Sequence, residues 1–310
     1  MKGQQPILIA GPTAGGKSGL AVRLAERYGG VVINADSMQV YRELRILTAQ
    51  PKPEEEARVP HALYGFVPGC ERYSAGRFAA DAARALDEAR SKGLRPIIVG
   101  GTGLYFKTLI EGLSPMPEID EPVGARWREA AARAGTGEMH RILSGRDPEM
   151  AGRLAAGDTQ RVVRALEVLD QTGVSLAAWQ RLPREPVLSE AETIRIVVAP
   201  ERAELVRRID ARFERMIKEG ALDEVRGLAA LKLDNSLPIM SALGVGPLLR
   251  HLAGEIDLAE ATQLAKAETR QYAKRQMTWA RGNMLSWTSV TTKEMKTSEA
   301  EIVSLIDLQH

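Results

Sequence analysis

The stretch Gly11-Pro12-Thr13-Ala14-Gly15-Gly16-Lys17-Ser18 decides the fold of this chain. It has the form GxxxxGK[ST], a phosphate-binding loop whose backbone N–H groups cradle phosphates. The apolar run at 6–10 predicts a buried strand before the loop. After the loop, Leu20, Leu24 and Tyr28 recur at helical spacing until Gly29. A strand, a glycine-rich loop and a helix N-terminus together direct N–H groups and a positive dipole end toward an anion.

Two side chains of this loop predict the ligand. Lys17 supplies a point charge for the outer phosphates, and the Ser18 hydroxyl is placed for Mg²⁺. We therefore expect the chain to bind a di- or triphosphate.

Strand and helix patterns alternate as far as residue 112, which is typical of a parallel α/β sheet. Apolar runs predict strands at 31–35, 61–67 and 95–99, of which 61–67 is the least regular, and a helix runs from the Ser74 cap to Gly93. From about residue 123 to 180 the pattern is only helical. Strand character returns at 193–199, and long helices are expected at 201–219 and 257–281. We expect an α/β fold in which residues 1–117 and 190–310 form a parallel core like that of P-loop NTPases. An all-helical insertion is expected at 118–189.

Composition bounds the class of protein. With 310 residues and 44% hydrophobic content, the chain can bury one large core or two domains. The single cysteine excludes a disulfide framework, and the scattered histidines do not suggest a zinc site. No apolar run has membrane-spanning or signal-peptide character, so we expect a cytoplasmic protein without a membrane partner. The 42 basic and 40 acidic residues nearly cancel, so any nucleic-acid surface must be a local patch.

Two polar residues follow predicted strands. Asp36 follows the strand at 31–35, and ligands bind at the carboxyl ends of parallel strands. We expect Asp36 to face the bound phosphate as a general base or Mg²⁺ ligand, the alternative being an Asp that caps the turn before Ser37. Thr102 follows the strand at 95–99, and its hydroxyl is expected to point into the same crevice, although Thr is also a good helix N-cap.

Three predicted helices carry basic faces. In 269–281, Arg270, Lys274 and Arg281 share one face, with Tyr272 and Trp279 opposite. Further basic faces are formed by Arg161 with Arg164, and by Arg208, Arg212 and Arg215. Such faces can present cations to a phosphate backbone. From spacing alone, ordinary amphipathic helices with a solvated basic side are the favoured alternative.

Six segments, in order along nearly the whole chain, closely resemble the tRNA dimethylallyltransferases of the IPP transferase family. They are GPTAGGKS at 11–18, ADSMQVY at 35–41, TAQP at 48–51, VGGTGLYFKTLIEGLSPMP at 99–117, DTQRVVRALEV at 158–168 and TRQYAKRQMTWAR at 269–281. GGTGLYFK and RQYAKRQMTW are the most diagnostic of these.

The resemblance implies a reaction. The enzyme would transfer a dimethylallyl group from dimethylallyl diphosphate to the N6 amine of adenosine 37, next to the anticodon of tRNA, with Mg²⁺ as cofactor. The loop at 11–18 would hold the diphosphate, and Arg212 would assist at that end. Asp36 would accept or orient the N6 proton, and Thr102 would line the channel where base and donor meet.

The resemblance also implies the tRNA contacts. We expect a monomer that binds the anticodon stem-loop. The residues expected to contact tRNA are Asp36, Ser37, Met38, Gln39, Thr102, Gln160, Arg161, Val162, Val163, Arg164, Lys274, Arg275, Gln276, Met277, Thr278, Trp279, Ala280 and Arg281.

The chain departs from the family pattern in places. Leu47 stands where a glycine is usual, and Leu243-Gly244-Val245-Gly246-Pro247 replaces a glycine-tyrosine-basic motif that would touch RNA. Substrate choice among tRNAs, or affinity, is therefore expected to differ.

Two other functions are compatible with parts of the sequence. A small-metabolite kinase would use the loop for ATP and Asp36 as base, but it leaves the basic helices without a role. A non-catalytic RNA-binding module would not need the intact Lys17, Ser18 and Asp36.

Overall fold

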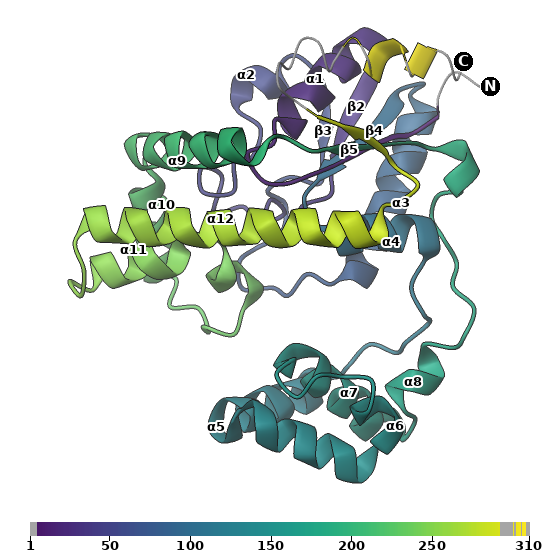
Figure 1. The fold of residues 1–310 in the computed structure, drawn as a ribbon, viewed down its shortest axis with the longest axis vertical. Coiled ribbons are helices and arrows are strands. Elements are labelled where there is room, and N and C mark those ends of the chain that lie inside the picture. The colour runs from purple at the N-terminus through teal and green to yellow at the C-terminus, as the bar shows by residue number, and fades with distance from the viewer. Residues whose placement is uncertain (1–4, 292–299, 301, 305, 308–310) are drawn as a thin grey trace. The chain divides into compact units, whose positions relative to one another are not determined.

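The computed structural model describes residues 5–291, 300, 302–304 and 306–307. Its strands are β1 (Ile7–Ala10), β2 (Gly30–Asn34), β3 (His61–Ala62), β4 (Arg95–Gly100), β5 (Ile194–Val198) and β6 (Thr288–Val290). They form one sheet in the order β3-β2-β4-β1-β5-β6, and every pairing is parallel (Figure 1). The expected α/β class with a parallel core is confirmed.

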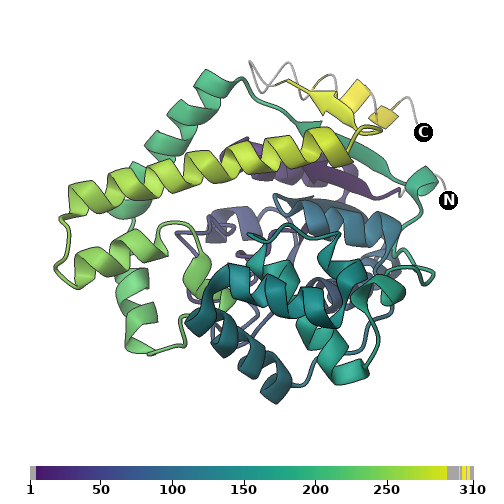
Figure 2. The same ribbon diagram turned by 60° about the horizontal axis from the view of Figure 1, so that its bottom comes forward.

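Eight α-helices accompany the sheet within residues 5–291. They are α1 (Lys17–Tyr28), α2 (Pro53–Glu56), α3 (Ala75–Ser91), α4 (Gly103–Glu111), α9 (Arg202–Lys218), α10 (Ala221–Ala230), α11 (Val245–Leu252) and α12 (Leu258–Asn283). The long helix α12 lies between α9 and α11 (Figures 1 and 2). It therefore brings residues from near the end of the chain to the elements that follow β1 and β2.

The sheet separates two apolar cores. Successive side chains of a strand point to opposite faces, so Ile7 and Ile9 pack on one face and Leu8 and Ala10 on the other. The first face is covered by α1, and the second by α3, α4 and the helices α10 to α12. Because β1 and β4 are buried throughout, β1 is a continuous apolar run and β4 is apolar from Pro96 to Val99.

The chain divides into two compact units. One contains the sheet and consists of residues up to Ile110 together with those from Val187 onward; the other is Glu111–Pro186. The second unit is all helical, with its own apolar core, and contains α5 (Glu121–Arg146), α6 (Pro148–Ala151), α7 (Thr159–Thr172) and α8 (Leu176–Trp179). The insertion expected at 118–189 overlaps this unit, whose boundaries fall at 111 and 186.

Two strands differ from expectation. The strand expected at 61–67 contains only His61 and Ala62, because Leu63 and Gly65 adopt positive φ angles that extended backbone does not have. Strand β6 was not predicted. It has three residues, two of them exposed, so it carries no apolar alternation.

Among the described residues, no helix is long and apolar enough to cross a membrane.

Candidate active site

The loop at 11–18 connects β1 to α1 and folds back on itself. Gly11 has a φ of +153°, and a Cβ there would lie 2.6 Å from the carbonyl oxygen of Val198 in β5. The Gly15 amide donates to the Pro12 carbonyl at 3.0 Å, and Lys17 begins α1. The Lys17 ammonium donates to the same carbonyl at 2.8 Å. The first amides of α1 and the Lys17 ammonium therefore lie at one end of the sheet, as an anion site requires.

Two cations of this site have lowered pKa values. Burial lowers the pKa of Lys17 to about 8, although the charge of Asp36 acts in the opposite direction. Burial also lowers the pKa of Arg212 to about 10, again opposed by Asp36. Arg212 lies on α9 and donates to the Thr13 hydroxyl in the loop. A lowered pKa means that the surrounding water and negative charge do not fully stabilise the cationic form. An anion bound here would therefore stabilise both cations.

Asp36 follows β2 and is held by a buried amide. The Asn34 side chain accepts from the Asp36 amide at 2.8 Å and donates to the Asp36 carbonyl at 3.0 Å. One carboxylate oxygen of Asp36, Oδ1, accepts from the Met38 amide at 3.0 Å. Asp36 thus caps a turn and also lines the loop and central cavities described below. It can therefore be both a turn-capping residue and a residue of the site.

Thr102 reaches the Asp36 turn from the neighbouring strand. Its hydroxyl accepts from the Ser37 amide at 2.9 Å and lies 3.2 Å from the Ser37 hydroxyl. The Thr102 carbonyl accepts from Tyr105 in the first turn of α4. Thr102 therefore links the ends of β2 and β4, and its hydroxyl is engaged by Ser37.

Gln276 of α12 joins the two loops. Its carbonyl oxygen accepts from the Thr13 amide at 2.8 Å, and its amide group donates to the Gly101 carbonyl at 2.8 Å. A single side chain from α12 therefore fixes the distance between the phosphate-binding loop and the loop that carries Thr102.

Three adjoining cavities surround these residues. The loop cavity, about 900 Å³, is lined by Thr13–Gly19, by residues 45–46 and 48–53, and by α9. The central cavity, about 260 Å³, shares Thr13, Asp36 and Arg212 with it. The side cavity, about 250 Å³, is lined by Thr102 and by Trp279, and adjoins the central cavity at Tyr272 and Arg275. Thr102 lines the side cavity and neither of the other two.

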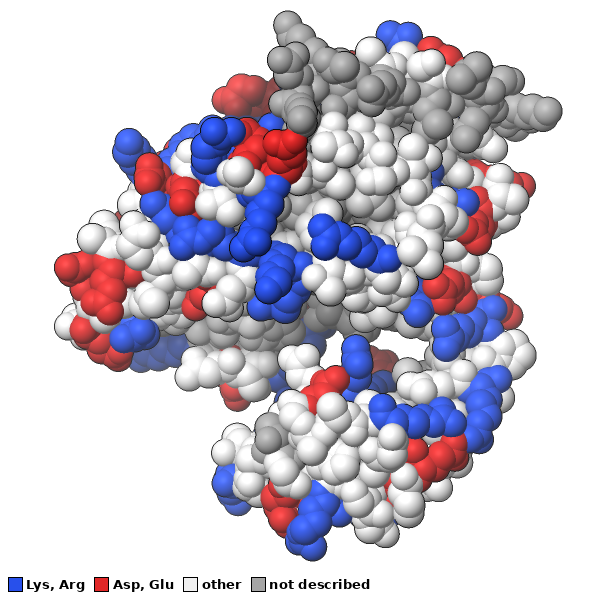
Figure 3. All heavy atoms as spheres, in the orientation of Figure 1, with Lys and Arg blue, Asp and Glu red and all other residues white. Residues whose placement is uncertain are grey.

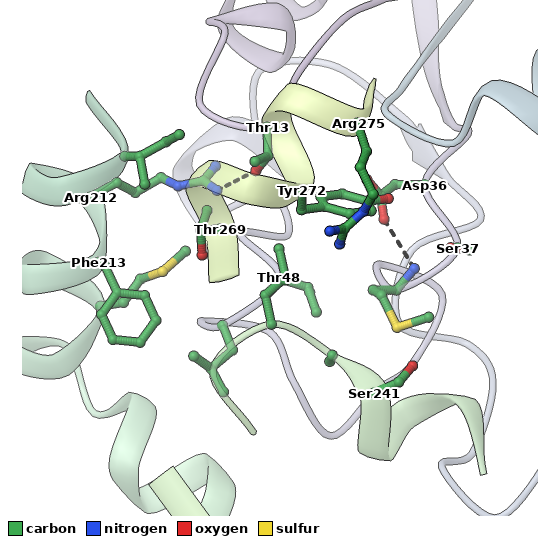
Figure 4. A pocket seen from close by; sticks show the side chains of 16 residues that line it. Thr13, Asp36, Ser37, Thr48, Arg212, Phe213, Ser241, Thr269, Tyr272 and Arg275 are labelled. Carbon is green, nitrogen blue, oxygen red and sulfur yellow. Dashed lines mark hydrogen bonds between the residues drawn. The ribbon is translucent and has the colours of Figure 1, made fainter. Parts of the chain in front are cut away.

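Charged, aromatic and apolar side chains line the central cavity together. Figure 4 shows Arg212 beside Thr13, with Tyr272 and Arg275 near Asp36 and Phe213 farther away. Arg275 is exposed and lies over the Tyr272 ring, 5.5 Å from its centroid. Burial raises the pKa of Tyr272, and the charge of Asp36 raises it further, so this phenol stays protonated.

The basic residues of α9 and α12 fall into two groups. Arg270 pairs with Asp210 of α9 at 2.7 Å and so joins the two helices, whereas Arg208 pairs with Glu204 at 2.7 Å within α9 itself. Lys274 and Arg281 are exposed and form no ion pair with a described residue. Figure 3 shows Lys and Arg side chains gathered over α9 and the adjoining part of α12.

Several residues expected to contact tRNA are already engaged or buried. Val162 and Val163 lie in the core of the helical unit, so in the segment 160–164 only Gln160, Arg161 and Arg164 reach the surface. Ala280 is buried too, so the side chains of these three apolar residues are covered in the structure, and their contact with tRNA stays a prediction. The Gln39 amide donates to two carbonyl groups, those of Thr48 and Ala49.

The segment 243–247 begins α11. Gly244 has a φ of +88°, and a Cβ there would lie 2.9 Å from the Phe213 ring. Leu243 lines the central cavity, whereas Val245 and Pro247 are buried. The segment that departs from the family pattern therefore packs against α9.

Sequence reasoning missed how α12 builds the site. Thr269, Tyr272, Gln276 and Trp279 follow helical spacing along one face, and this face lines the central and side cavities. The segment 269–281 carries this signal in the helical spacing of its aromatic residues, Tyr272 and Trp279. Glu224 of α10 gave no sequence signal.

Comparison with known proteins places these features in context. Residues 39–283 match the family model described as IPP transferase, and residues 5–61 match the one described as isopentenyl transferase. A tRNA dimethylallyltransferase of Parvibaculum lavamentivorans is 51% identical over 97% of this chain and 95% of its own length. One of Beijerinckia indica is 53% identical over 94% of this chain and 96% of its own length.

Solved structures agree with the sequence relatives. The tRNA isopentenylpyrophosphate transferase of Bacillus halodurans has a TM-score of 0.71 and 32% identity, covering 99% of this chain and 96% of that one. A eukaryotic dimethylallyltransferase acting on tRNA has a TM-score of 0.76 and 26% identity, covering 94% of this chain and 75% of that one.

Affinity for an anion in the loop cavity should depend on the charge of Lys17. Its pKa is lowered to about 8, so the cation is populated below pH 8 and is lost as the pH rises through this value. The affinity advantage of the native chain over Lys17→Met for pyrophosphate, measured by calorimetry, should fall about tenfold or more between pH 7 and 9.5. The variant serves as control because titration of the ligand itself affects both chains equally. A ratio that stays constant with pH would exclude this role of Lys17.

Proposed function

The chain belongs to the IPP transferase family, and we propose that its prenyl donor and its target adenosine meet at Asp36. The chain is a transferase that moves a prenyl group onto tRNA. We propose dimethylallyl diphosphate as donor and the N6 amine of adenosine 37, next to the anticodon, as acceptor. The observation that carries this assignment is that Lys17, Arg212 and Asp36 line one cavity beside the phosphate-binding loop.

The loop cavity suits a diphosphate that becomes a leaving group. When the bond between the allylic carbon and the diphosphate oxygen breaks, negative charge grows on the diphosphate and positive charge on the prenyl fragment. Lys17, Arg212 and the loop amides stabilise the first, and they are in place before the reaction. The buried position of Lys17 and the partly buried position of Arg212 strengthen this effect, because there is less water to screen them.

The residues present fit a magnesium ion. Mg²⁺ prefers oxygen ligands and is often bound by one or two protein groups together with substrate phosphates. Ser18 and Asp36 supply such oxygens to the loop cavity, and no cluster of three or more His, Cys, Asp or Glu with metal-site geometry occurs among the described residues. Ser18 would hold the ion against the diphosphate, where it would neutralise charge on the leaving group.

Asp36 is placed to assist the acceptor. The adenine amine is a poor nucleophile, and it loses a proton as the new N–C bond forms. Because Oδ1 of Asp36 is fixed by the Met38 amide, Oδ2 is the oxygen that can accept or orient this proton. The bond from carbon to diphosphate oxygen breaks, the bond from N6 to carbon forms, and the diphosphate leaves.

The target base must leave its stack to reach Asp36. Turning a base out costs a few kcal/mol, which contacts to the RNA backbone can offset. We propose that Lys274 and Arg281 of α12, and Gln160, Arg161 and Arg164 of α7, provide such contacts to the anticodon stem-loop, and that the chain acts as a monomer. All five side chains reach the surface of their unit.

Replacing Asp36 by Asn should separate chemistry from binding. The amide oxygen can still accept from Met38, so the turn remains, but the group cannot take a proton. Transfer of labelled prenyl group from dimethylallyl diphosphate to tRNA should fall about 10²-fold or more, with tRNA affinity near normal. Asp87→Asn, an exposed carboxylate of α3, is the matched control. Loss of tRNA binding with an unchanged rate of prenyl transfer would contradict the assignment. Transfer of γ-phosphate from ATP by the native chain would contradict it too.

Replacing Lys274 and Arg281 together by Ala should weaken tRNA binding and flatten its salt dependence. Each phosphate contact releases about one counterion, so the slope of log affinity against log salt should fall by roughly two. A double replacement of Arg90 and Lys92, exposed at the end of α3, is the control. An unaltered slope would show that this face of α12 is an ordinary solvated surface.

A further inference from the structure

The loop cavity has a wall without helix or strand. We call residues 45–51 the wall segment; all but Leu47 line the loop cavity, and Leu47 and Thr48 line the central one. Ala49 has a φ of +55°, which costs free energy for a residue with a side chain. The wall segment therefore needs contacts from elsewhere in the fold to keep this conformation.

Glu224 of α10 provides one such contact. Its carboxylate accepts from two successive amides of the wall segment, those of Ile46 at 2.7 Å and Leu47 at 3.0 Å. Hydrogen bonds to an ionised carboxylate are stronger than those between neutral groups. Burial raises the pKa of Glu224, while these amides and that of Arg45 lower it.

The other half of the wall segment is held separately. The Gln39 amide donates to the carbonyl groups of Thr48 and Ala49 at 2.9 and 2.8 Å. Glu224 and Gln39 thus fix opposite halves of the same wall segment, one through its N–H groups and one through its carbonyl groups.

The negative charge of Glu224 is unfavourable for a cavity that binds an anion. Its side chain lines the loop cavity, where it repels a diphosphate, and it forms no ion pair with a described residue. A carboxylate at such a place has a cost for anion binding. Its contacts with the wall segment give a reason for its presence.

We propose that Glu224 is a positioning residue that holds the wall segment in the arrangement that binds the prenyl donor. This inference rests on the proposed function of the loop cavity. When the competent arrangement is populated only part of the time, the apparent affinity falls by that fraction. Loss of Glu224 therefore weakens donor binding without touching the tRNA contacts.

Steady-state kinetics of prenyl transfer with Glu224→Ala and Glu224→Gln test this inference. For Glu224→Ala, the KM for dimethylallyl diphosphate should rise about tenfold or more, and the KM for tRNA should stay within about twofold. Glu224→Gln, which keeps one acceptor, should lie between Ala and the native chain. Asp223→Asn, in the same turn of α10 and exposed, is the control and should behave as native.

Hydrogen exchange provides a readout that does not depend on turnover. The amides of residues 45–47 should exchange faster in Glu224→Gln than in the native chain, and pyrophosphate should slow this exchange. An unchanged donor KM in folded Glu224→Ala, or equal losses for donor and tRNA, would overturn the inference, as would unchanged exchange. Absence of prenyl transfer by the native chain would instead refute the proposed function, and the exchange result would still decide the role of Glu224.

Discussion

Two cations, the buried Lys17 and the partly buried Arg212, lie near a single carboxylate, that of Asp36. This imbalance of charge is the constraint on which the site depends. Both cations have lowered pKa values because burial removes water that would stabilise them. In the proposed function, a bound diphosphate supplies the missing negative charge. Since further charge would develop on the diphosphate as it leaves, the same residues would favour the reaction even more than they favour binding.

The fold places this charge by bringing distant segments to one edge of the sheet. The ends of β1, β2 and β4 carry the phosphate-binding loop, Asp36 and Thr102, and parallel strands align these ends. Helices α9 and α12 then close the site, with Arg212 and Gln276 each contacting Thr13. Because one side chain, Gln276, joins two of the loops, a single helix links the phosphate-binding loop to the loop that carries Thr102.

Local patterns predicted the parts of the fold that depend on local physics. Strand β1, the phosphate-binding loop and α1 follow from apolar runs and glycines, and Ser74 caps α3 through the Arg77 amide. Strand β6 was not predicted because three residues are too few to show an apolar alternation. The contacts of Gln276 with Thr13 and of Glu224 with Ile46 were not predicted. Their partners lie 263 and 178 residues away along the chain, and no spacing rule links such positions.

A crystal structure of the chain with an anticodon stem-loop and a non-hydrolysable diphosphate analogue of the donor tests the account most directly. We expect the diphosphate to contact the Lys17 ammonium, the Arg212 guanidinium and the amides of the loop, with the extruded adenine presenting its N6 to Oδ2 of Asp36. A diphosphate bound away from this loop, or an adenine on a different side chain, would contradict it.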